Sequence, residues 1–231
     1  MTSLQERLEA VQSNIALECA ALKRDPREVT LIVVTKNHSV QLVRELISIG
    51  HRDFGENRDQ EAAPKARLIA DENLLERNLY NWHFIGQLQT NKVKSVLRYA
   101  DAVHSLDRES LLAVLQKECL ILDRKLDVFI QLNLTQDDGR GGLSLDQIES
   151  FTEQVLASSN LNLKGVMGVA SLDAEPAKDF ELIANASARV QKLAPSANQI
   201  SAGMSGDYLE ALKYGATHLR IGTAITGNRQ Y

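Results

Sequence analysis

A lysine at the end of an apolar segment is the residue best suited to covalent chemistry. Lys36 follows the β-branched run 29–35, whose composition predicts a fully buried parallel strand. Because α/β barrels keep their active sites at the carboxyl ends of the strands, we expect this amine at the mouth of a barrel. An amine that is desolvated beside apolar walls can attack an aldehyde and form a Schiff base. The alternative is a lysine whose ammonium group simply reaches solvent.

Two glycine-containing segments near the end of the sequence predict an anion site. The first holds Gly203, Met204 and Ser205, and the second holds Gly222 and Thr223. Glycine lets backbone N–H groups approach a ligand, and we expect Ser205 to head a helix whose free N–H groups favour an anion. Since barrels commonly bind phosphate in the loops after strands seven and eight, the two segments indicate a phosphate site. The alternative is that both glycines are turn residues and that Ser205 is only an N-cap.

A phosphate site and a strand-end lysine that face one cavity suggest a phosphorylated aldehyde as the ligand. Pyridoxal 5′-phosphate fits this description, with its aldehyde on Lys36 and its phosphate near Ser205 and Thr223. A phosphosugar aldolase or isomerase fits the same two features. These residues alone do not decide between the two classes.

The segments that must position these residues alternate between strand and helix. Strand patterns are expected at 29–35, 51–54, 82–85, 102–104, 126–132, 163–169, 198–201 and 218–221. Helical patterns are expected at about 3–23, 39–50, 56–70, 91–99, 109–122, 144–157, 176–193 and 205–214. Eight strands in alternation with helices is the count of a (β/α)8 barrel of the TIM type, an α/β fold.

Local signals set the expected ends of several helices. Ser3 and Glu6 match a capping box at the start of the first helix, and Ser144 and Gln147 match a second one. Further N-caps and glycine stops are expected at Ser39, Asp107, Gly50 and Gly215.

The first helix has a particular place in this prediction. Only residues 222–231 follow the eighth strand, too few for a full outer helix, so we expect the N-terminal helix to fill that gap in the ring. The chain shows no linker, low-complexity tract or internal repeat. We therefore expect a single domain over residues 1–231, with one helix added at its N-terminus.

The composition excludes several functional classes. A net charge of −4 argues against a nucleic-acid or acidic-membrane partner, and we interpret the stripe Lys92, Lys94 and Arg98 as a solvated helix face. No stretch is apolar enough to span a membrane and none resembles a signal peptide. Cys19 and Cys119 lie in helix-like apolar patterns and are interpreted as reduced core thiols. A cytoplasmic protein is expected.

Two histidines deserve a separate interpretation. His83 and His104 lie in or beside expected strands, and no third residue accompanies them at a spacing typical of metal ligands. We therefore expect hydrogen-bonding or packing roles for both, and no metal site.

Several segments of the chain carry a resemblance to a known family. They are 34–36 (VTK), 54–57 (FGEN), 83–92 (HFIGQLQTNK), 103–107 (VHSLD), 203–207 (GMSGD) and 220–225 (RIGTAI), with Gly227 and Arg229. In these segments the chain resembles the pyridoxal phosphate homeostasis proteins, which are similar to the barrel domain of alanine racemase. The likeness covers nearly the whole length, and the segments 83–92 and 220–225 are the most specific.

The resemblance implies a site for pyridoxal 5′-phosphate. It implies that Lys36 carries the cofactor as a Schiff base, that Arg220 faces the pyridine nitrogen and that Asn57 lies near the cofactor. The residues that it places around the phosphate are Gly203, Met204, Ser205, Gly222 and Thr223. Two further candidates for contact with the cofactor are His83 and Met167.

Some positions depart from the family pattern. Asn37 and His38 follow the lysine, Ala202 stands where methionine is common, and 140–142 (RGG) replaces a Lys-x-Gly pattern. None of these positions is an anchoring residue, so cofactor binding is still expected. The role of the loop 137–142 stays open, and a solvated lid is the simplest interpretation.

The arginine bears on the type of reaction. A guanidinium group stays protonated, so a pyridine nitrogen opposite Arg220 would remain a neutral acceptor and the ring would be a weak electron sink. Transaminases and decarboxylases instead use a carboxylate at that position. We therefore expect a binding protein without established turnover that stores, buffers or delivers the cofactor and so affects amino-acid and keto-acid balance.

The main alternative is a weakly active amino-acid racemase. Racemisation needs a second acid or base on the opposite face of the cofactor, typically a tyrosine. We interpret the tyrosines of this chain as packing or surface residues: Tyr80, Tyr99, Tyr208, Tyr214 and Tyr231. The expected partners are the cofactor and the apo-enzymes that use it, and a monomer is expected.

Overall fold

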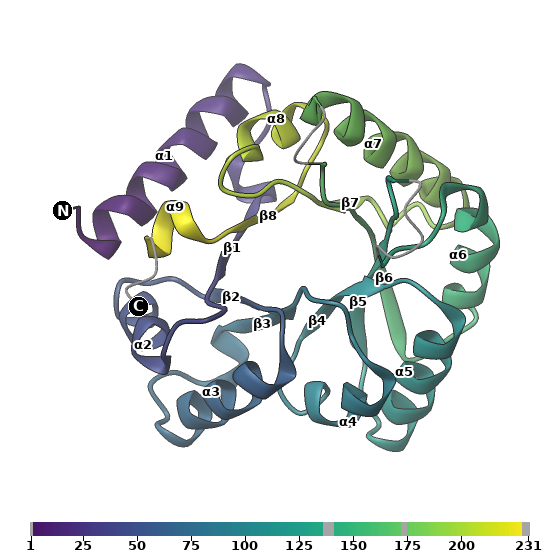
Figure 1. Ribbon diagram of the computed structural model, residues 1–231, viewed down its shortest axis with the longest axis horizontal. Coiled ribbons are helices and arrows are strands. Elements are labelled where there is room, and N and C mark those ends of the chain that lie inside the picture. Colours follow the sequence, from purple (N-terminus) through teal and green to yellow (C-terminus); the bar gives the residue numbers. More distant parts are fainter. Residues whose placement is uncertain (1, 136–140, 172–174, 228–231) are drawn as a thin grey trace.

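The computed structural model describes residues 2–135, 141–171 and 175–227, and these residues form a closed barrel of eight parallel strands. The strands follow one another around the barrel in chain order (Figure 1). Thr30 lies opposite His218, and Val33 lies opposite Ile221, which closes the barrel between the first strand and the last. The predicted (β/α)8 fold is confirmed.

The strands are short, as expected for a barrel of this type. Their bounds are β1 (Thr30–Val34), β2 (Asp53–Glu56), β3 (Asn81–Phe84), β4 (Ala102–Leu106), β5 (Leu126–Gln131), β6 (Leu161–Met167), β7 (Gln199–Ser201) and β8 (His218–Ile221). The second, fourth and sixth strands depart most from the predicted bounds. β2 spans 53–56 instead of 51–54, β4 extends to Leu106 with a register shift against β5 after Val103, and β6 spans 161–167 instead of 163–169.

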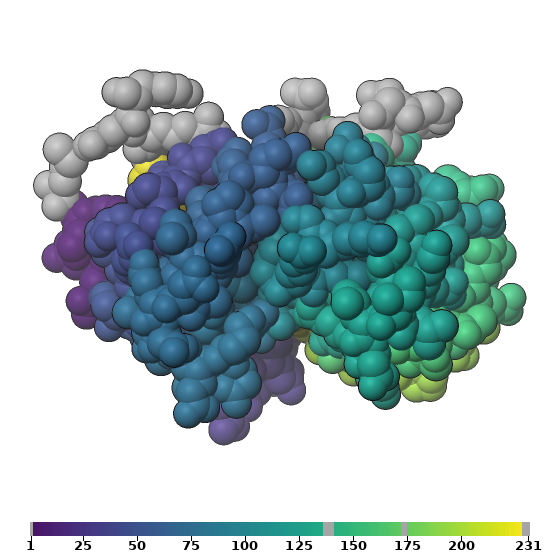
Figure 2. Space-filling model, turned by 90° about the horizontal axis from the view of Figure 1, so that it is seen from below, coloured from purple at the N-terminus to yellow at the C-terminus, as the bar shows by residue number. Residues whose placement is uncertain are grey.

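Helices surround the barrel on the outside. They are α1 (Leu4–Ala21), α2 (Val40–Ser48), α3 (Asp59–Asp71), α4 (Val93–Val96), α5 (Glu109–Ile121), α6 (Ile148–Leu156), α7 (Pro176–Leu193), α8 (Tyr208–Lys213) and α9 (Thr223–Thr226). Short 3-10 turns are η1 (Pro26–Glu28), η2 (Arg77–Leu79), η3 (Thr90–Lys92) and η4 (Leu145–Gln147). Figure 2 shows the wall that the segments coloured from blue to teal build on one side of the molecule.

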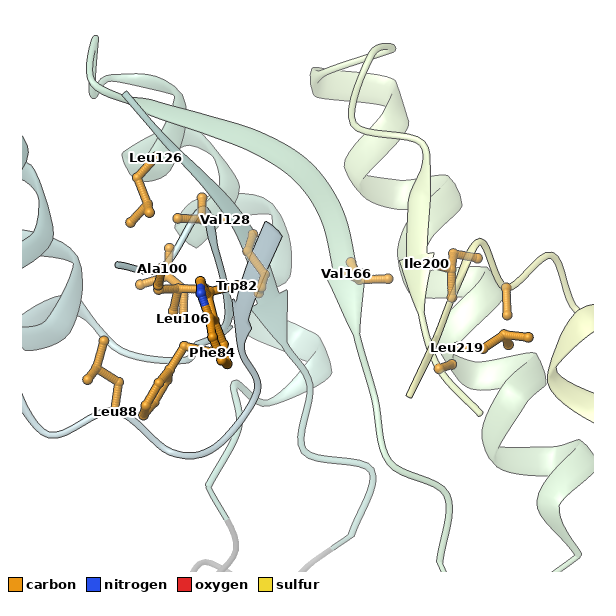
Figure 3. Packing of buried hydrophobic residues seen from close by; sticks show 14 of the residues in the cluster. Trp82, Phe84, Leu88, Ala100, Leu106, Leu126, Val128, Val166, Ile200 and Leu219 are labelled. Atoms are coloured by element: carbon orange, nitrogen blue, oxygen red, sulfur yellow. The ribbon is translucent and has the colours of Figure 1, made fainter. Parts of the chain in front are cut away.

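The alternation of side chains along each strand divides the buried residues between two places. Outward residues such as Val33 and Leu219 belong to one hydrophobic cluster with helix residues such as Leu46. Figure 3 shows part of this shell between sheet and helices, with Trp82 and Phe84 packed together. The buried apolar residues outside the cluster are Ile32, Val34, Ala102, Phe129 and Met167. These five share the inward parity of their strands and lie in the lumen of the barrel.

The first helix lies where it was expected. In Figure 1, α1 runs along the outside of the ring beside α8 and α9. The Arg7 side chain donates to the carbonyl of Ile225 at 2.6 Å, and Arg24 donates to the carbonyl of Leu212 at 2.7 Å. Because α9 is only four residues long, α1 supplies the outer helix next to β8.

The capping predictions have mixed outcomes. The box at α1 is confirmed, since Ser3 Oγ accepts the N–H of Glu6 at 3.1 Å and Glu6 accepts the N–H of Ser3 at 2.6 Å. The box at Ser144 is wrong. Its hydroxyl donates to the Gln147 side chain at 3.0 Å instead of capping backbone N–H groups, and α6 begins only at Ile148 after a 3-10 turn.

The other helix ends are also informative. Asp107 is not an N-cap, because it forms an ion pair with Arg108, the residue that precedes α5. Ser39 precedes α2 as expected, but its side chain makes no capping hydrogen bond. Gly50 and Gly215 end their helices with φ of +91° and +87°, so both glycine stops are confirmed.

Candidate functional site

Lys36 lies in a tight turn directly after β1. The turn is closed by a hydrogen bond of 3.2 Å from the N–H of His38 to the carbonyl of Thr35. Asn37 has a φ of +61°, a left-handed conformation that asparagine tolerates, and its N–H donates to Glu61 of α3 at 2.8 Å. The lysine is thus presented at the carboxyl end of the barrel by a turn that α3 holds.

Apolar walls do not enclose the amine of Lys36 in this structure, in agreement with the alternative of a lysine that reaches solvent. Its side chain is exposed, because β1 ends at Val34 and the chain has already begun to turn. Ile32 and Val34 face the lumen, so the alternation of the strand assigns Lys36 to the lumen side of the mouth. Exposure makes the amine accessible to a ligand that enters from solvent.

A buried polar cluster that sequence reasoning missed supports this turn. Glu56 is fully buried, and its Oε1 accepts the Thr35 hydroxyl at 2.6 Å and the Lys65 ammonium group at 2.6 Å. Lys65 also donates to the carbonyl of Thr35 at 2.8 Å. Burial raises the pKa of the Glu56 carboxyl, although the charge and hydrogen bonds of Lys65 act against that rise. The available signal was a lysine on the buried stripe of α3, between Ala62 and Ile69.

Asn57 lies at the end of β2, next to the strand that carries Lys36. The N–H of Thr35 donates to the carbonyl of Gly55 at 2.9 Å, which ties the two strand ends together. Among the described residues, Asn57 Oδ1 is buried without a hydrogen-bond partner. A Cβ at Gly86 would lie 2.1 Å from the Asn57 carbonyl oxygen, so only glycine fits there. Asn57 Oδ1 is therefore an acceptor that no described residue satisfies.

The two glycine-containing segments meet on the same rim. The N–H of Ala224 donates to Ser205 Oγ at 3.3 Å, which joins the loop after β7 to the loop after β8. Gly203 has a φ of +91°, and a Cβ there would lie 2.9 Å from that of Ala211. Thr223 is exposed. The predicted meeting of the two segments is therefore seen in the structure.

The predicted helix start at Ser205 is wrong. α8 begins at Tyr208, and the residue before it is Asp207. The Asp207 carboxylate accepts the N–H of Met204 at 2.5 Å, so this loop folds around Asp207 and delays the helix by three residues. Ser205 thus contributes its hydroxyl to the rim, and the N–H of Met204 is already bonded within the loop.

Arg220 lies inside the barrel with only 5% of its surface exposed. Its guanidinium group donates to Ser201 Oγ at 2.7 Å and to the carbonyl of Gly168 at 2.9 Å. Burial lowers the pKa of Arg220 to about 10, so it stays charged at neutral pH. Met167 is buried in the lumen beside Gly168. The resemblance implies that Arg220 faces the pyridine nitrogen, and in the structure this residue is a charged hydrogen-bond donor in a fixed position.

His83 lies apart from this group. It is buried in β3 and bonds to His104 at 3.0 Å and to Asp53, the first residue of β2, at 3.1 Å. No group of three or more potential metal-binding side chains lies together in the described part of the chain. Arg140 and Arg229, and most of the loop 137–142, lie outside the described residues.

Comparisons with known proteins complete the description. Residues 7–230 match the family described as alanine racemase, N-terminal domain. The chain is 33% identical over 242 residues to the pyridoxal phosphate homeostasis protein of Mycobacterium tuberculosis, with 99% of this chain and 94% of that protein covered. The chain belongs to the pyridoxal phosphate homeostasis protein family. The family member from Escherichia coli is 32% identical over 234 residues, with 100% and 99% covered.

Solved structures agree with this family assignment. PipY of Synechococcus elongatus, whose structure has pyridoxal phosphate bound, is 32% identical with a TM-score of 0.80, covering 92% of this chain and all (100%) of that chain. Alanine racemase of Corynebacterium glutamicum shares the fold, with a TM-score of 0.69 and 15% identity over 97% of this chain and 62% of that chain. Among the described residues of this pyridoxal phosphate homeostasis family member, no helix has the length and apolarity to cross a membrane.

Proposed function

We propose that this chain binds pyridoxal 5′-phosphate and takes part in its homeostasis, by storing, buffering or delivering the cofactor. Through that role it affects amino-acid and keto-acid balance. The names of its full-length relatives and the cofactor bound to PipY support the proposal. The geometry of the barrel mouth supports it independently.

One observation carries the proposal: the amine and the phosphate loops share one rim. A Cβ at Gly222 would lie 3.6 Å from Cβ of Val34, so the loop after β8 packs against the end of β1. Lys36 follows Val34 by two residues, and Thr223 follows Gly222 directly. The turn that carries Lys36 and the loop that carries Thr223 are therefore neighbours on the rim, which supports a ligand that has both an aldehyde and a phosphate.

The residues present fit each part of the cofactor. Pyridoxal 5′-phosphate supplies an aldehyde that condenses with amines. Lys36 offers an accessible amine for it, and the hydroxyl groups of Ser205 and Thr223 with the backbone of Gly203 and Gly222 would hold the phosphate. The backbone N–H of Met204 would join them by exchanging its bond to Asp207 for one to the phosphate. Asn57 offers an acceptor that has no other partner. Met167 and His83 are proposed as more distant contacts.

Arg220 sets the character of the bound ring. Its guanidinium group is a permanent donor whose position is fixed by two hydrogen bonds. A donor of this kind opposite the pyridine nitrogen would leave that nitrogen unprotonated, and this would disfavour transamination and decarboxylation. Lys36 and Arg220 thus bind and orient the cofactor, and neither adds a second acid or base.

A weak racemase is the second candidate, favoured by the fold shared with alanine racemase. The described tyrosines do not favour it. Tyr80, Tyr99 and Tyr208 are buried in the shell cluster between sheet and helices, and Tyr214 packs against that cluster. None of these four offers a hydroxyl acid at the mouth. We therefore propose that any racemase turnover is slow and that the main role is that of a carrier.

The remaining parts of the proposal concern context. The recipients are apo-enzymes that use pyridoxal 5′-phosphate, and nucleic acids and membranes are not partners. The chain acts as a monomer in the cytoplasm, and residues 1–231 form one domain. Sedimentation of the loaded protein tests the monomer, since a dimer would double the observed mass.

The decisive experiment is the visible absorbance of protein incubated with pyridoxal 5′-phosphate and then dialysed. Wild type should be yellow, Lys36→Ala should lose the band while it keeps its circular dichroism spectrum, and Lys178→Ala, an exposed lysine on α7, should match wild type. A colourless wild type, or a band that survives in Lys36→Ala, would overturn the proposal.

Delivery and racemisation have their own readouts. Loaded wild type should activate an apo-aminotransferase when the two are mixed. The activation should be faster than with the same amount of cofactor supplied on an unrelated protein that binds it. No transfer at all would restrict the role to storage. Rapid loss of optical rotation from L-alanine would favour the racemase instead.

A further inference from the structure

A line of buried hydrogen bonds crosses the lumen of the barrel, beginning at Arg220. The Arg220 guanidinium group donates to Ser201 Oγ at 2.7 Å, and Ser201 Oγ lies 2.8 Å from Nδ1 of His104. Nε2 of His104 lies 3.0 Å from Nδ1 of His83, and Nε2 of His83 lies 3.1 Å from Oδ1 of Asp53. We call these five residues the lumen relay.

The relay links the two ends of the barrel. Asp53 lines a cavity of about 370 Å³ at the end opposite to Lys36. This floor is identified by the first residues of the strands, which line the cavity: Thr30, Asp53, Asn81, Ala102, Gln199 and His218. Between floor and mouth the relay is shielded, since Ser201 and His104 have no exposed surface and His83 has 6%.

The two ends of the relay fix its direction. A guanidinium group can only donate and a carboxylate can only accept. If Arg220 donates to Ser201, the single Ser201 proton goes to Nδ1 of His104. His104 then donates from Nε2 to Nδ1 of His83, and His83 donates from Nε2 to Asp53. Every link has one proton when both histidines are neutral with the proton on Nε2.

The competing arrangement leaves a group unsatisfied. With His83 protonated, it would donate to both Asp53 and His104, and His104 would donate from Nδ1 to Ser201. Ser201 Oγ would then accept twice, and its own proton would have no acceptor among the described residues, in a site without exposed surface. A buried donor without a partner costs on the order of 1–3 kcal/mol. The neutral arrangement is therefore favoured.

The surroundings of His104 also favour its neutral form. His104 stacks on Phe129, with ring centroids 4.3 Å apart and planes at 20°. Burial lowers the pKa of His104 well below its ordinary value, and the charge of the nearby Arg220 guanidinium group lowers it further. Burial would raise the pKa of Asp53, but hydrogen bonds from His83 and Asn81 lower it overall. A charged Asp53 carboxylate at the floor and a neutral His104 imidazole in the lumen are the result.

We propose that Ser201, His104 and His83 are positioning residues for Arg220, and that Asp53 at the floor sets the proton order of the whole relay. The inference extends the proposed function, because Arg220 is the residue that would meet the cofactor ring. In the relay, Ser201 Oγ accepts a hydrogen bond from Arg220. The carboxylate of Asp53 at the other end of the barrel therefore helps to fix the position of the guanidinium group.

The first test needs no cofactor. Nitrogen-15 NMR of the free protein at neutral pH should show both relay histidines with the proton on Nε2. Asp53→Leu should let both histidines populate the Nδ1 form, whereas Asp53→Asn keeps an acceptor oxygen and should retain the wild-type tautomers. Asp127→Asn, which changes another carboxylate of the same floor cavity, is the matched control. A wild-type His104 protonated on Nδ1, or tautomers unchanged in Asp53→Leu, would overturn the inference.

The second test uses the loaded protein. Ser201→Ala should shift the midpoint of the spectral pH titration by about one pH unit or more, while cofactor retention stays within a factor of two or so. His104→Phe should act in the same direction, and Asp53→Leu at the floor serves if His104→Phe fails to fold. An unchanged titration in these variants would contradict the positioning role. If the protein bound no cofactor, the proposed function would be wrong. The NMR test would still decide whether the relay exists, because it uses the free protein.

Discussion

The ammonium group of Lys65 lies 2.6 Å from Oε1 of Glu56, beneath the turn that carries Lys36. Both side chains are buried, and the same ammonium group bonds the carbonyl of Thr35 at 2.8 Å. Helix α3 therefore fixes the end of β1 through a lysine that would not itself touch the cofactor. A proposed binding lysine and a structural lysine thus lie on the two sides of one strand end.

Lys65→Met should destabilise the protein strongly. The change leaves the Glu56 carboxylate buried without its cation, which typically costs about 3–5 kcal/mol. Urea unfolding at neutral pH measures the loss. The double variant Lys65→Met/Glu56→Gln should recover part of it, and Lys178→Met, which breaks an exposed pair with Glu175, should cost at most about 1 kcal/mol. A small effect of Lys65→Met would show that the pair is not coupled to the fold.

Gly86→Ala should disturb the site through the backbone. An added Cβ would lie 2.1 Å from the carbonyl oxygen of Asn57, so the Asn57 strand end must move. We expect a loss of stability of about 1–3 kcal/mol and weaker retention of pyridoxal 5′-phosphate, measured by urea unfolding and by dialysis. Gly206→Ala is the control, because nothing lies within 4 Å of a Cβ there. Equal behaviour of the two variants would refute this account of Gly86.

Arg220→Ala should change the spectrum of the bound cofactor more than it weakens binding. The covalent attachment to Lys36 and the phosphate contacts supply most of the affinity, whereas Arg220 acts on the ring. Absorbance followed from acid to alkaline pH should show an altered titration, and dialysis should show nearly complete retention. If the cofactor were lost on dialysis, this division of roles would be wrong.

The folded state should lose stability in acid because of His218. Burial lowers the pKa of His218 to about 3, while an unfolded histidine titrates near pH 6.5. Between these values the unfolded state binds more protons than the folded state. The contribution of His218 to the free energy of unfolding is therefore fully present above the unfolded pKa, and it decreases as the pH is lowered, by up to about 1.4 kcal/mol per pH unit. Urea unfolding between pH 7 and 4 measures the slope. His218→Gln should flatten it, and an unchanged slope would assign the loss to other groups.

Much of the architecture could be predicted from the sequence because its signals are local. The β-branched run before Lys36, and the glycines at 50 and 215, each specify their structure through neighbouring residues alone. The joining of the Ser205 and Thr223 loops followed from barrel geometry, since the ends of parallel strands share one rim. The exposure of Lys36 was one of two alternatives that the sequence left open, because the choice depends on where β1 ends, and it ends at Val34.

Other features depend on contacts between distant segments. Asp207 bonds the N–H of Met204 and moves the start of α8, which a capping preference for serine does not reveal. The pairing of Lys65 with Glu56 requires the packing of α3 on β2. The lumen relay requires the register of five strand positions, so His83 and His104 looked like two separate histidines in the sequence.

The apolar shell outside the sheet and the lumen, which also holds polar residues such as Arg220 and His104, differ in how they should tolerate substitution. Most buried apolar residues lie in the shell cluster between sheet and helices, so the residues inside the barrel contribute less to the stability of the fold. Substitutions of single lumen residues are therefore expected to cost less stability than substitutions of residues in the shell cluster. A change of the lumen residues can therefore alter which ligand the barrel binds while the shell cluster still maintains the fold.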